Sequence, residues 1–200
     1  MLLNRIEKAM MNNPVRSLVQ RLYETRKLTK MGGRVEGQHC LEVGCGRGVG
    51  AELVLDRFGA ASVDAFDLDP NMVELARERV LRRGDRVRIW QGSVTAIDAP
   101  DATYDAVFDF GIIHHVPRWR DALGEVYRVL KPGGRFFAEE VLRKFILHPV
   151  WRRMLDHPLD DRFDREQFVS ALERAGFDVV DSDELFGDFA FFVADRPALT

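Results

Sequence analysis

Residues 41–50 carry the pattern with the clearest chemical meaning. The segment reads LEVGCGRGVG, so that glycine occupies every second position from Gly44 to Gly50. An apolar strand that leads through glycines into a helix lets a ligand approach the backbone closely, because no side chains block it. We therefore predict a cofactor site at this turn, and a glycine-rich turn without a ligand is the alternative.

The glycine pattern alone leaves the identity of the cofactor open. A dinucleotide fingerprint, G-x-G-x-x-G/A, fits Gly46, Gly48 and Ala51. Asp67 follows about twenty residues later, where such sites place an acid on a ribose hydroxyl. The same arrangement suits any adenosine-containing cofactor, so an NAD-dependent oxidoreductase is one of the alternatives.

Side chains that could move a proton follow two later strands. His114 and His115 come directly after the fourth predicted strand, and Glu139 and Glu140 end the fifth. Ligands bind at the carboxyl ends of strands in open α/β sheets, and histidine titrates near neutral pH. Strand alternation directs only one of the two glutamates into the cleft, and we assign that role to Glu139. Asp109 is placed to orient a histidine; for each histidine, packing or helix capping is the alternative.

The elements that position these groups alternate along the chain. Five near-continuously apolar strands, separated by helix-length segments, indicate a parallel sheet covered on both faces. The last two strands are too close for a crossover and must form an antiparallel hairpin. The predicted strands are residues 40–43, 63–66, 87–90, 106–110, 135–139, 178–183 and 189–194, and the predicted helices include residues 49–58, 119–130 and 165–175.

Helix ends are signalled by specific residues. Asp69-Pro70 is a cap and first-turn pair for the helix after the second strand. Asp164 and Gln167 form a capping box for the last helix. Asn13-Pro14 begins an N-terminal helix that Gly32-Gly33 ends.

Four segments together resemble the class I S-adenosylmethionine-dependent methyltransferases, in the branch of small-molecule enzymes of the ubiquinone/menaquinone type. They are LEVGCGRGVG (41–50), AFDLDPNMVELA (65–76), YDAVFDFGIIHHVPRWRDALGEVYRVLKPGGRFFAEE (104–140) and REQFVSALERAGFDVV (165–180). The resemblance covers about residues 38–194. It implies a doubly wound α/β fold, with a seven-stranded sheet that is parallel except for one strand. It also implies methyl transfer from S-adenosylmethionine to an oxygen, nitrogen or carbon of a small or lipid-like acceptor.

The resemblance also implies which residues hold the cofactor. Glu42 fills the acidic position of the first motif, and Asp67 would hold the ribose. Gly92-Ser93 departs from the family's usual Gly-Asp after the third strand, and a serine accepts a hydrogen bond without charge. The implied contacts are Glu42, Gly44, Gly46, Asp67, Leu68, Met72, Ser93, Val94 and Phe110, with plain core packing as the alternative for Leu68 and Met72. Resemblance to phosphoethanolamine methyltransferases favours His114 over His115 as the base.

We predict a single domain with a cover on each side of the cofactor core. Its parts are a helical lid (1–35), the core (38–140), a substrate-side segment (141–162) and a last helix with its hairpin (163–194). The basic, aromatic-rich run 141–157 either caps the core or lies on an anionic membrane surface.

Residues 1–36 contain eight lysines and arginines and three acids, a net +5 in a chain of net −3, so the remainder carries −8.

The overall composition narrows the function classes. The chain has 200 residues, 46% of them hydrophobic and 30% charged, which is typical of a globular protein. Its negative net charge argues against nucleic acid as the main partner. No apolar stretch is long enough to span a membrane and no signal peptide precedes the domain, so we expect a cytoplasmic protein. Cys40 and Cys45 lack metal-ligand spacing, so no metal site is expected. A cofactor-binding module without turnover, docked on membranes, stays an alternative.

Overall fold

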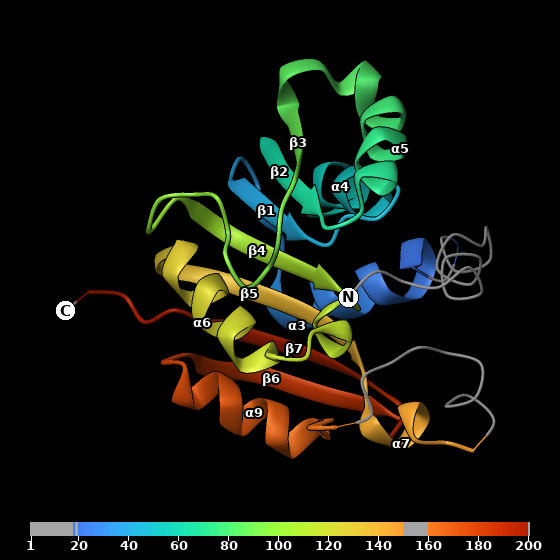
Figure 1. The fold of residues 1–200 in the computed structure, drawn as a ribbon. Helices are drawn as coiled ribbons and strands as arrows, with labels where there is room; N and C mark the ends of the chain where they lie inside the picture. Colours follow the sequence, from blue (N-terminus) through green and yellow to red (C-terminus); the bar gives the residue numbers. More distant parts are fainter. Residues whose placement is uncertain (1–17, 19, 150–159, 200) are drawn as a thin grey trace.

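The computed structural model describes residues 18, 20–149 and 160–199 of the chain. The predicted helix start at Asn13-Pro14 and the second half of the run 141–157 lie outside these residues. One seven-stranded sheet, in the order β3-β2-β1-β4-β5-β7-β6, forms the centre (Figure 1). Its strands are β1 (His39–Val43), β2 (Ser62–Asp67), β3 (Val87–Gln91), β4 (Tyr104–Phe110), β5 (Leu130–Val141), β6 (Asp178–Leu185) and β7 (Phe189–Asp195).

The pairing of the strands confirms the predicted topology. Strands β1 to β5 pair in parallel, whereas β7 runs antiparallel to both β5 and β6. Strand β5 begins earlier than the predicted 135. Tyr104 pairs with Leu130 and Ala106 with Arg135, so the Lys131–Gly134 segment bulges out of the ladder instead of ending it.

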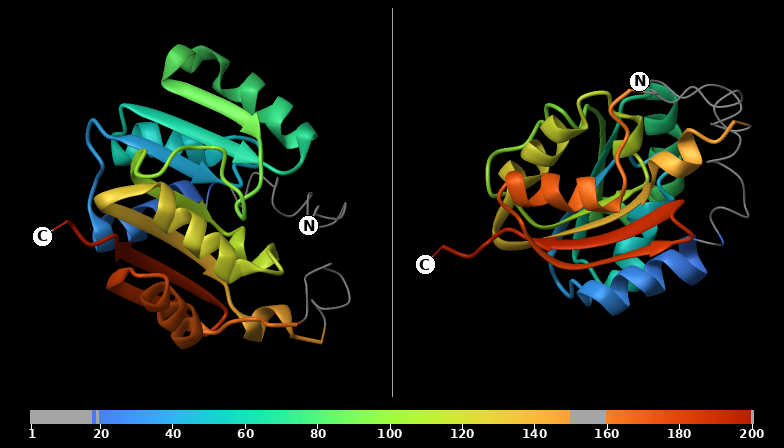
Figure 2. Two further views of the ribbon diagram at one scale, coloured as in Figure 1. Left: turned by 60° about the vertical axis from the view of Figure 1, so that its left-hand side comes forward. Right: turned by 90° about the horizontal axis from the view of Figure 1, so that it is seen from below.

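Helices cover both faces of the sheet, as predicted (Figure 2). One face carries α3 (Thr25–Gly32), α4 (Val49–Leu53) with the π-helical turn η2 (Val54–Phe58), and α5 (Pro70–Val80). The other face carries α6 (Trp119–Val129) and α9 (Arg165–Arg174). Two separate apolar clusters result, one around Phe58 and one around Trp119. None of the helices in the described parts of the chain is long and apolar enough to cross a bilayer.

Both predicted helix caps are present. The Asp69 carboxylate accepts a hydrogen bond from the backbone N–H of Asn71 (2.9 Å) at the start of α5. The Asp164 carboxylate accepts from the N–H of Gln167, whose side chain accepts from the N–H of Asp164 (2.9 and 3.1 Å). Caps of this kind contribute about 1 kcal/mol each to stability.

Helix α3 is packed directly on the sheet. Leu28 is fully buried, and a Cβ atom at Gly32 would lie 2.3 Å from the Phe137 ring. Arg135 donates a hydrogen bond to the Gly32 carbonyl (2.5 Å). The inner side of α3 therefore belongs to the core, and lid behaviour of residues 1–35 stays a prediction.

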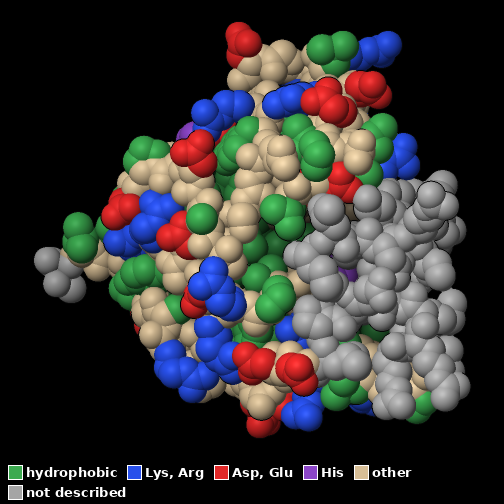
Figure 3. Space-filling view, viewed as in Figure 1, with side chains coloured by type: hydrophobic (Ala, Val, Ile, Leu, Met, Phe, Trp, Pro, Cys, Tyr) green, Lys and Arg blue, Asp and Glu red, His purple; other side chains and the backbone are tan. Residues whose placement is uncertain are grey.

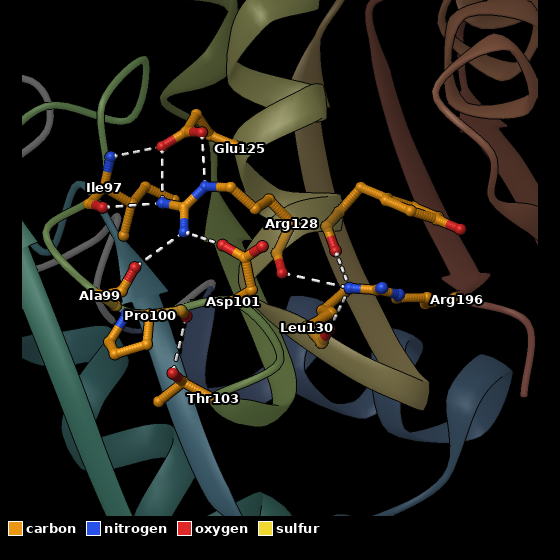
Figure 4. A network of polar contacts seen from close by, with 10 residues as sticks. Ile97, Ala99, Pro100, Asp101, Thr103, Glu125, Arg128, Leu130 and Arg196 are labelled. Atoms are coloured by element: carbon orange, nitrogen blue, oxygen red, sulfur yellow. Dashed lines mark hydrogen bonds and ion pairs between the residues drawn. The ribbon is translucent and has the colours of Figure 1, made fainter. Parts of the chain in front are cut away.

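The loop between β3 and β4 is fixed by the Arg128 side chain of α6 (Figure 4). Its guanidinium donates to the carbonyls of Ile97 (2.9 Å) and Ala99 (2.8 Å) and to the carboxylates of Asp101 (2.8 Å) and Glu125 (2.7 Å). Glu125 in turn accepts from the N–H of Ile97 (2.7 Å). Because residues 92–95 of this loop face the functional site, the network sets the position of one wall of that site.

Candidate functional site

A cleft of about 250 Å³ opens at the carboxyl ends of β1, β2, β3 and β4. Figure 3 shows apolar side chains gathered in a hollow at the centre of this face. The lining residues are Gly44, Phe66, Asp67, Leu68, Gly92, Ser93, Val94, Thr95, Ile112, His115, Val116, Pro117 and Arg118. The structure thus brings five of the nine predicted cofactor contacts to one cleft: Gly44, Asp67, Leu68, Ser93 and Val94.

The glycine turn after β1 has backbone conformations that need glycine. Gly44 has φ of 69°, and a Cβ atom there would lie 2.6 Å from Ile112. Gly46 has φ of 50°, and a Cβ atom there would meet nothing within 4 Å. The first glycine therefore permits close packing, whereas the second leaves its backbone facing open space, which a ligand can approach.

Asp67 ends β2 at the edge of the cleft. One carboxylate oxygen accepts from the N–H of Gly46 (2.8 Å) and the other from the N–H of Asp69 (2.9 Å). These bonds fix the side chain, although burial still raises its pKa above the ordinary value. A carboxylate has about four acceptor positions, so Asp67 can accept further hydrogen bonds from a ligand in the cleft.

Glu42 lies behind the glycine turn rather than among the lining residues. Its side chain is buried, and its Oε2 atom has no hydrogen-bond partner in the described structure. Burial, together with the charge of Asp67, raises its pKa well above the usual range. A Cβ atom at position 50 would lie 1.8 Å from its Oε1 atom, so Gly50 makes room for this carboxyl group.

The remaining predicted cofactor contacts differ in their surroundings. Leu68, at the cleft, is 42% exposed, whereas Phe110 is buried and stacks on Phe108 with ring centroids 6.0 Å apart. Met72 is half-buried on α5. The Ser93 hydroxyl lies 3.0 Å from that of Thr95. Met72 and Phe110 are not among the residues that line the cleft.

The two histidines occupy the short turn η4 (Ile113–His115) and differ in position. His115 lines the cleft, whereas His114 is buried and its Nδ1 atom lies 2.5 Å from Glu140 Oε2. Glu140 also accepts from the N–H groups of Ile113 (2.7 Å) and His114 (3.1 Å). The glutamate that meets His114 is therefore Glu140; Glu139 is also buried, and the catalytic roles of His114 and Glu139 stay predictions.

Two further charged groups lie around His114: Asp109, which the sequence indicated, and Arg162, which it did not. Asp109 accepts from the N–H of Ile112 (2.9 Å), and burial with the neighbouring Glu140 carboxyl raises its pKa well above the ordinary value. Burial raises the pKa of Glu140 to about 7. Arg162 donates a hydrogen bond to the His114 carbonyl. The two residues are 48 positions apart, and no local motif predicts this contact. Among the described residues, no group of three or more His, Cys, Asp or Glu side chains could hold a metal ion.

Comparison with known proteins identifies the family. Residues 40–134 match the family described as a methyltransferase domain. The ubiquinone/menaquinone biosynthesis C-methyltransferase of Brucella anthropi is 30% identical over 181 residues, covering 77% of this chain and 68% of that protein. The chain belongs to the class I S-adenosylmethionine-dependent methyltransferases. This membership sets aside the NAD-dependent oxidoreductase considered above.

Other methyltransferases are similar over smaller parts of their length. The fatty-acid O-methyltransferase of Mycolicibacterium smegmatis is 36% identical over 126 residues, covering 62% of this chain and 45% of that protein. The chain spans about half the length of the first curated relatives it matches. A putative methyltransferase solved with the Haloferax volcanii Trm112 activator has the same fold. Its TM-score is 0.78 at 20% identity, covering 97% of this chain and 99% of that one.

The residues around the methyltransferase cleft suit S-adenosylmethionine. Asp67 offers acceptor positions at the edge of the cleft, which suit hydroxyl groups of a ligand, and Gly46 leaves space for close approach to the backbone. The Oε2 atom of Glu42, buried and without a donor, suits a cationic or N–H-bearing ligand, because a buried polar atom is expected to find a partner.

Proposed function

We propose that this protein transfers a methyl group from S-adenosylmethionine to a small or lipid-like acceptor. The observation that carries the proposal is the fixed Asp67 carboxylate, which meets the glycine turn at the carboxyl edge of the sheet. Bound there, S-adenosylmethionine supplies a methyl group that its sulfonium already activates. The protein's own residues must orient the reactants and exclude water, and orientation alone can supply much of the acceleration.

The proposed contacts follow from the chemistry of each side chain. Asp67 accepts hydrogen bonds from the two ribose hydroxyls, and Leu68 with Val94 provides apolar walls for the adenine. The Ser93 hydroxyl bonds to the adenine edge without the charge that an aspartate would bring. Glu42 offers its Oε2 atom as an acceptor to the amino group of the cofactor from beneath the glycine turn. Met72 and Phe110 pack behind the residues that contact the cofactor.

His114 is the proposed general base. A hydroxyl or a protonated amine must lose a proton on methylation, and a positioned histidine contributes about 10²–10⁴-fold to such a step. The hydrogen bond to Glu140 supports this role because it holds the imidazole in one orientation. Glu139 is the second candidate for proton transfer. His115, at the cleft wall, is the natural comparison residue.

An apolar acceptor is favoured by two observations. The two curated relatives described above are named for methylation of fatty acids and for ubiquinone/menaquinone biosynthesis. In addition, Ile112, Val116 and Pro117, which line the cleft and are not assigned to the cofactor, are apolar. The membrane contact predicted for residues 141–157 would serve such an acceptor, and it stays a prediction.

The proposal is tested by release of S-adenosylhomocysteine over a panel of fatty acids, quinone precursors, sterols and small amines. We expect turnover with at least one apolar acceptor. His114→Ala should lower that turnover by about 10²–10⁴-fold with little change in cofactor affinity, whereas His115→Ala should act mainly on stability. Tight cofactor binding without product from any acceptor would favour the non-catalytic binding module.

A further inference from the structure

A second concave surface lies on the side of the sheet that carries α3, between α3 and η2. It has a volume of about 330 Å³ and shares no residue with the cleft. Five basic side chains line it: Arg21, Arg26, Lys30, Arg34 and Arg57. We call these five residues the basic groove. Figure 2 shows α3 on the outside of the sheet, on the face opposite α9, so the groove faces outward.

Most of the charge in the basic groove is not neutralised by the protein. Arg21 forms an ion pair with Glu52 (3.1 Å) and Arg34 with Glu36 (2.8 Å). Within the residues that the structure describes, Arg26, Lys30 and Arg57 have no acidic partner.

Two arginines outside the groove, one on each face of the sheet, are each paired with two acids. Arg83 contacts both Asp56 and Glu52, and Arg128 contacts both Glu125 and Asp101. The groove is therefore a concentrated positive site on a chain of negative net charge, which favours an anionic partner.

Apolar side chains stand beside these charges. Leu18 and Leu22 are 53% and 49% exposed, and they precede Arg26 and Lys30 at steps of four residues. All four side chains are exposed, and residues four apart are near neighbours on a helix surface, so the leucines stand beside the cations on the outer side of this segment. A basic stripe with exposed leucines is typical of a helix that lies in a membrane interface. A nucleic acid backbone would use the cations but not the leucines.

We infer that the basic groove docks on an anionic phospholipid surface, with Leu18 and Leu22 entering the headgroup boundary. Clusters of four to eight Lys and Arg on an amphipathic helix bind such surfaces, and each cation adds to the affinity until salt screens it. The contact would bring the domain to a membrane, where lipid-like molecules are concentrated. It uses a face of the protein that does not touch the cofactor cleft.

Sedimentation with lipid vesicles tests the inference. The full chain should bind vesicles of equimolar phosphatidylcholine and phosphatidylglycerol, and should not bind vesicles of phosphatidylcholine alone. Arg26→Ala/Lys30→Ala/Arg57→Ala should weaken binding by about tenfold or more. Leu22→Ala should weaken it a few-fold at unchanged net charge. Circular dichroism and binding of S-adenosylhomocysteine should show that each variant is folded.

A matched control separates the effect of losing the groove from the effect of lowering the net charge of the protein. Arg82→Ala/Arg120→Ala/Arg174→Ala removes three exposed cations that line neither the groove nor the cofactor cleft, and this variant should bind vesicles like the parent. Equal loss in both triple variants, or no binding of the parent to anionic vesicles, would overturn the inference. So would tighter binding of an RNA duplex than of vesicles, or full displacement by inorganic phosphate. Vesicle binding and methyl transfer are measured separately, so failure of one is distinguishable from failure of the other.

Discussion

The Nδ1 atom of His114 lies 2.5 Å from the Oε2 atom of Glu140, in the interior beneath the cofactor cleft. When Glu140 is ionised its carboxylate can only accept, so the Nδ1 atom must then carry the proton, and a neutral imidazole in this tautomer has its lone pair on the Nε2 atom. The same carboxylate accepts from the N–H groups of Ile113 and His114. Glu140 therefore fixes both the turn η4 and the protonation pattern of its histidine.

Glu140→Gln should alter the tautomer of His114. A glutamine amide has one acceptor and two donors, so it cannot serve the three donors that now face Glu140. Nitrogen NMR at pH 8, where Glu140 is ionised, should show a single Nδ1–H tautomer in the parent and a mixture in the variant. Glu139→Gln is the matched control and should leave the tautomer unchanged. An unchanged tautomer in Glu140→Gln would contradict the positioning role.

Asp109→Asn should flatten the dependence of stability on pH. The raised pKa of Asp109 means that the unfolded chain loses this proton at lower pH than the folded protein does. Stability from this group is therefore fully present below about pH 3.9 and falls as pH rises toward the folded pKa. The asparagine keeps an acceptor for Ile112 without a titrating proton. Urea unfolding from pH 5 to 8 should show a smaller fall for the variant, and an equal fall would contradict the assignment.

Gly46→Ala should impair cofactor binding more than folding. A Cβ atom there meets no protein atom but projects into the space left for a ligand, at a cost in backbone strain of about 1–2 kcal/mol. Gly37→Ala is the control, because Gly37 also has positive φ with open space around it and lies away from the cleft. Both variants should melt alike, and only Gly46→Ala should lose affinity for S-adenosylhomocysteine, by about tenfold or more. Equal affinities would show that the backbone of this turn does not meet the cofactor.

Arg128→Ala should loosen the loop that carries Ser93 and Val94. The variant loses charge-assisted hydrogen bonds to two carbonyls and two carboxylates, so the free energy of unfolding should fall by about 1–3 kcal/mol. Hydrogen exchange should rise at residues 92–99 first. Arg82→Ala, which removes an exposed arginine, should change neither quantity.

Local sequence signals predicted the sheet because each strand and cap is encoded within a few residues. The Asp69 and Asp164 caps are examples. The antiparallel hairpin is another, because the connection between its two strands is too short for a parallel crossover. The start of β5 was missed because Pro-Gly-Gly normally ends a strand. Here β4 pairs with β5 before and after this segment, so the segment is tolerated as a bulge.

The site was less predictable wherever contacts span the sequence. The turn at Gly44–Gly48 and the acid at Asp67 are spaced by a motif, and the structure joins them through the hydrogen bond from the Gly46 N–H to Asp67. The arrangement of His114 with Glu140 and Arg162 depends on how a three-residue turn folds against a distant strand and loop, and no periodicity encodes that. Alternation indicated that the two glutamates point to opposite sides but not which of them the turn would meet.

Calorimetric titration of the parent and of Asp67→Ala tests the central claim most directly. The parent should bind S-adenosylmethionine and S-adenosylhomocysteine and should not bind NAD(H). Asp67→Ala should lose charge-assisted hydrogen bonds to the ribose, about 1.5–3 kcal/mol, and therefore bind roughly ten- to a hundred-fold more weakly. Unchanged affinity in a folded Asp67→Ala variant, or preference of the parent for NAD(H), would contradict the account.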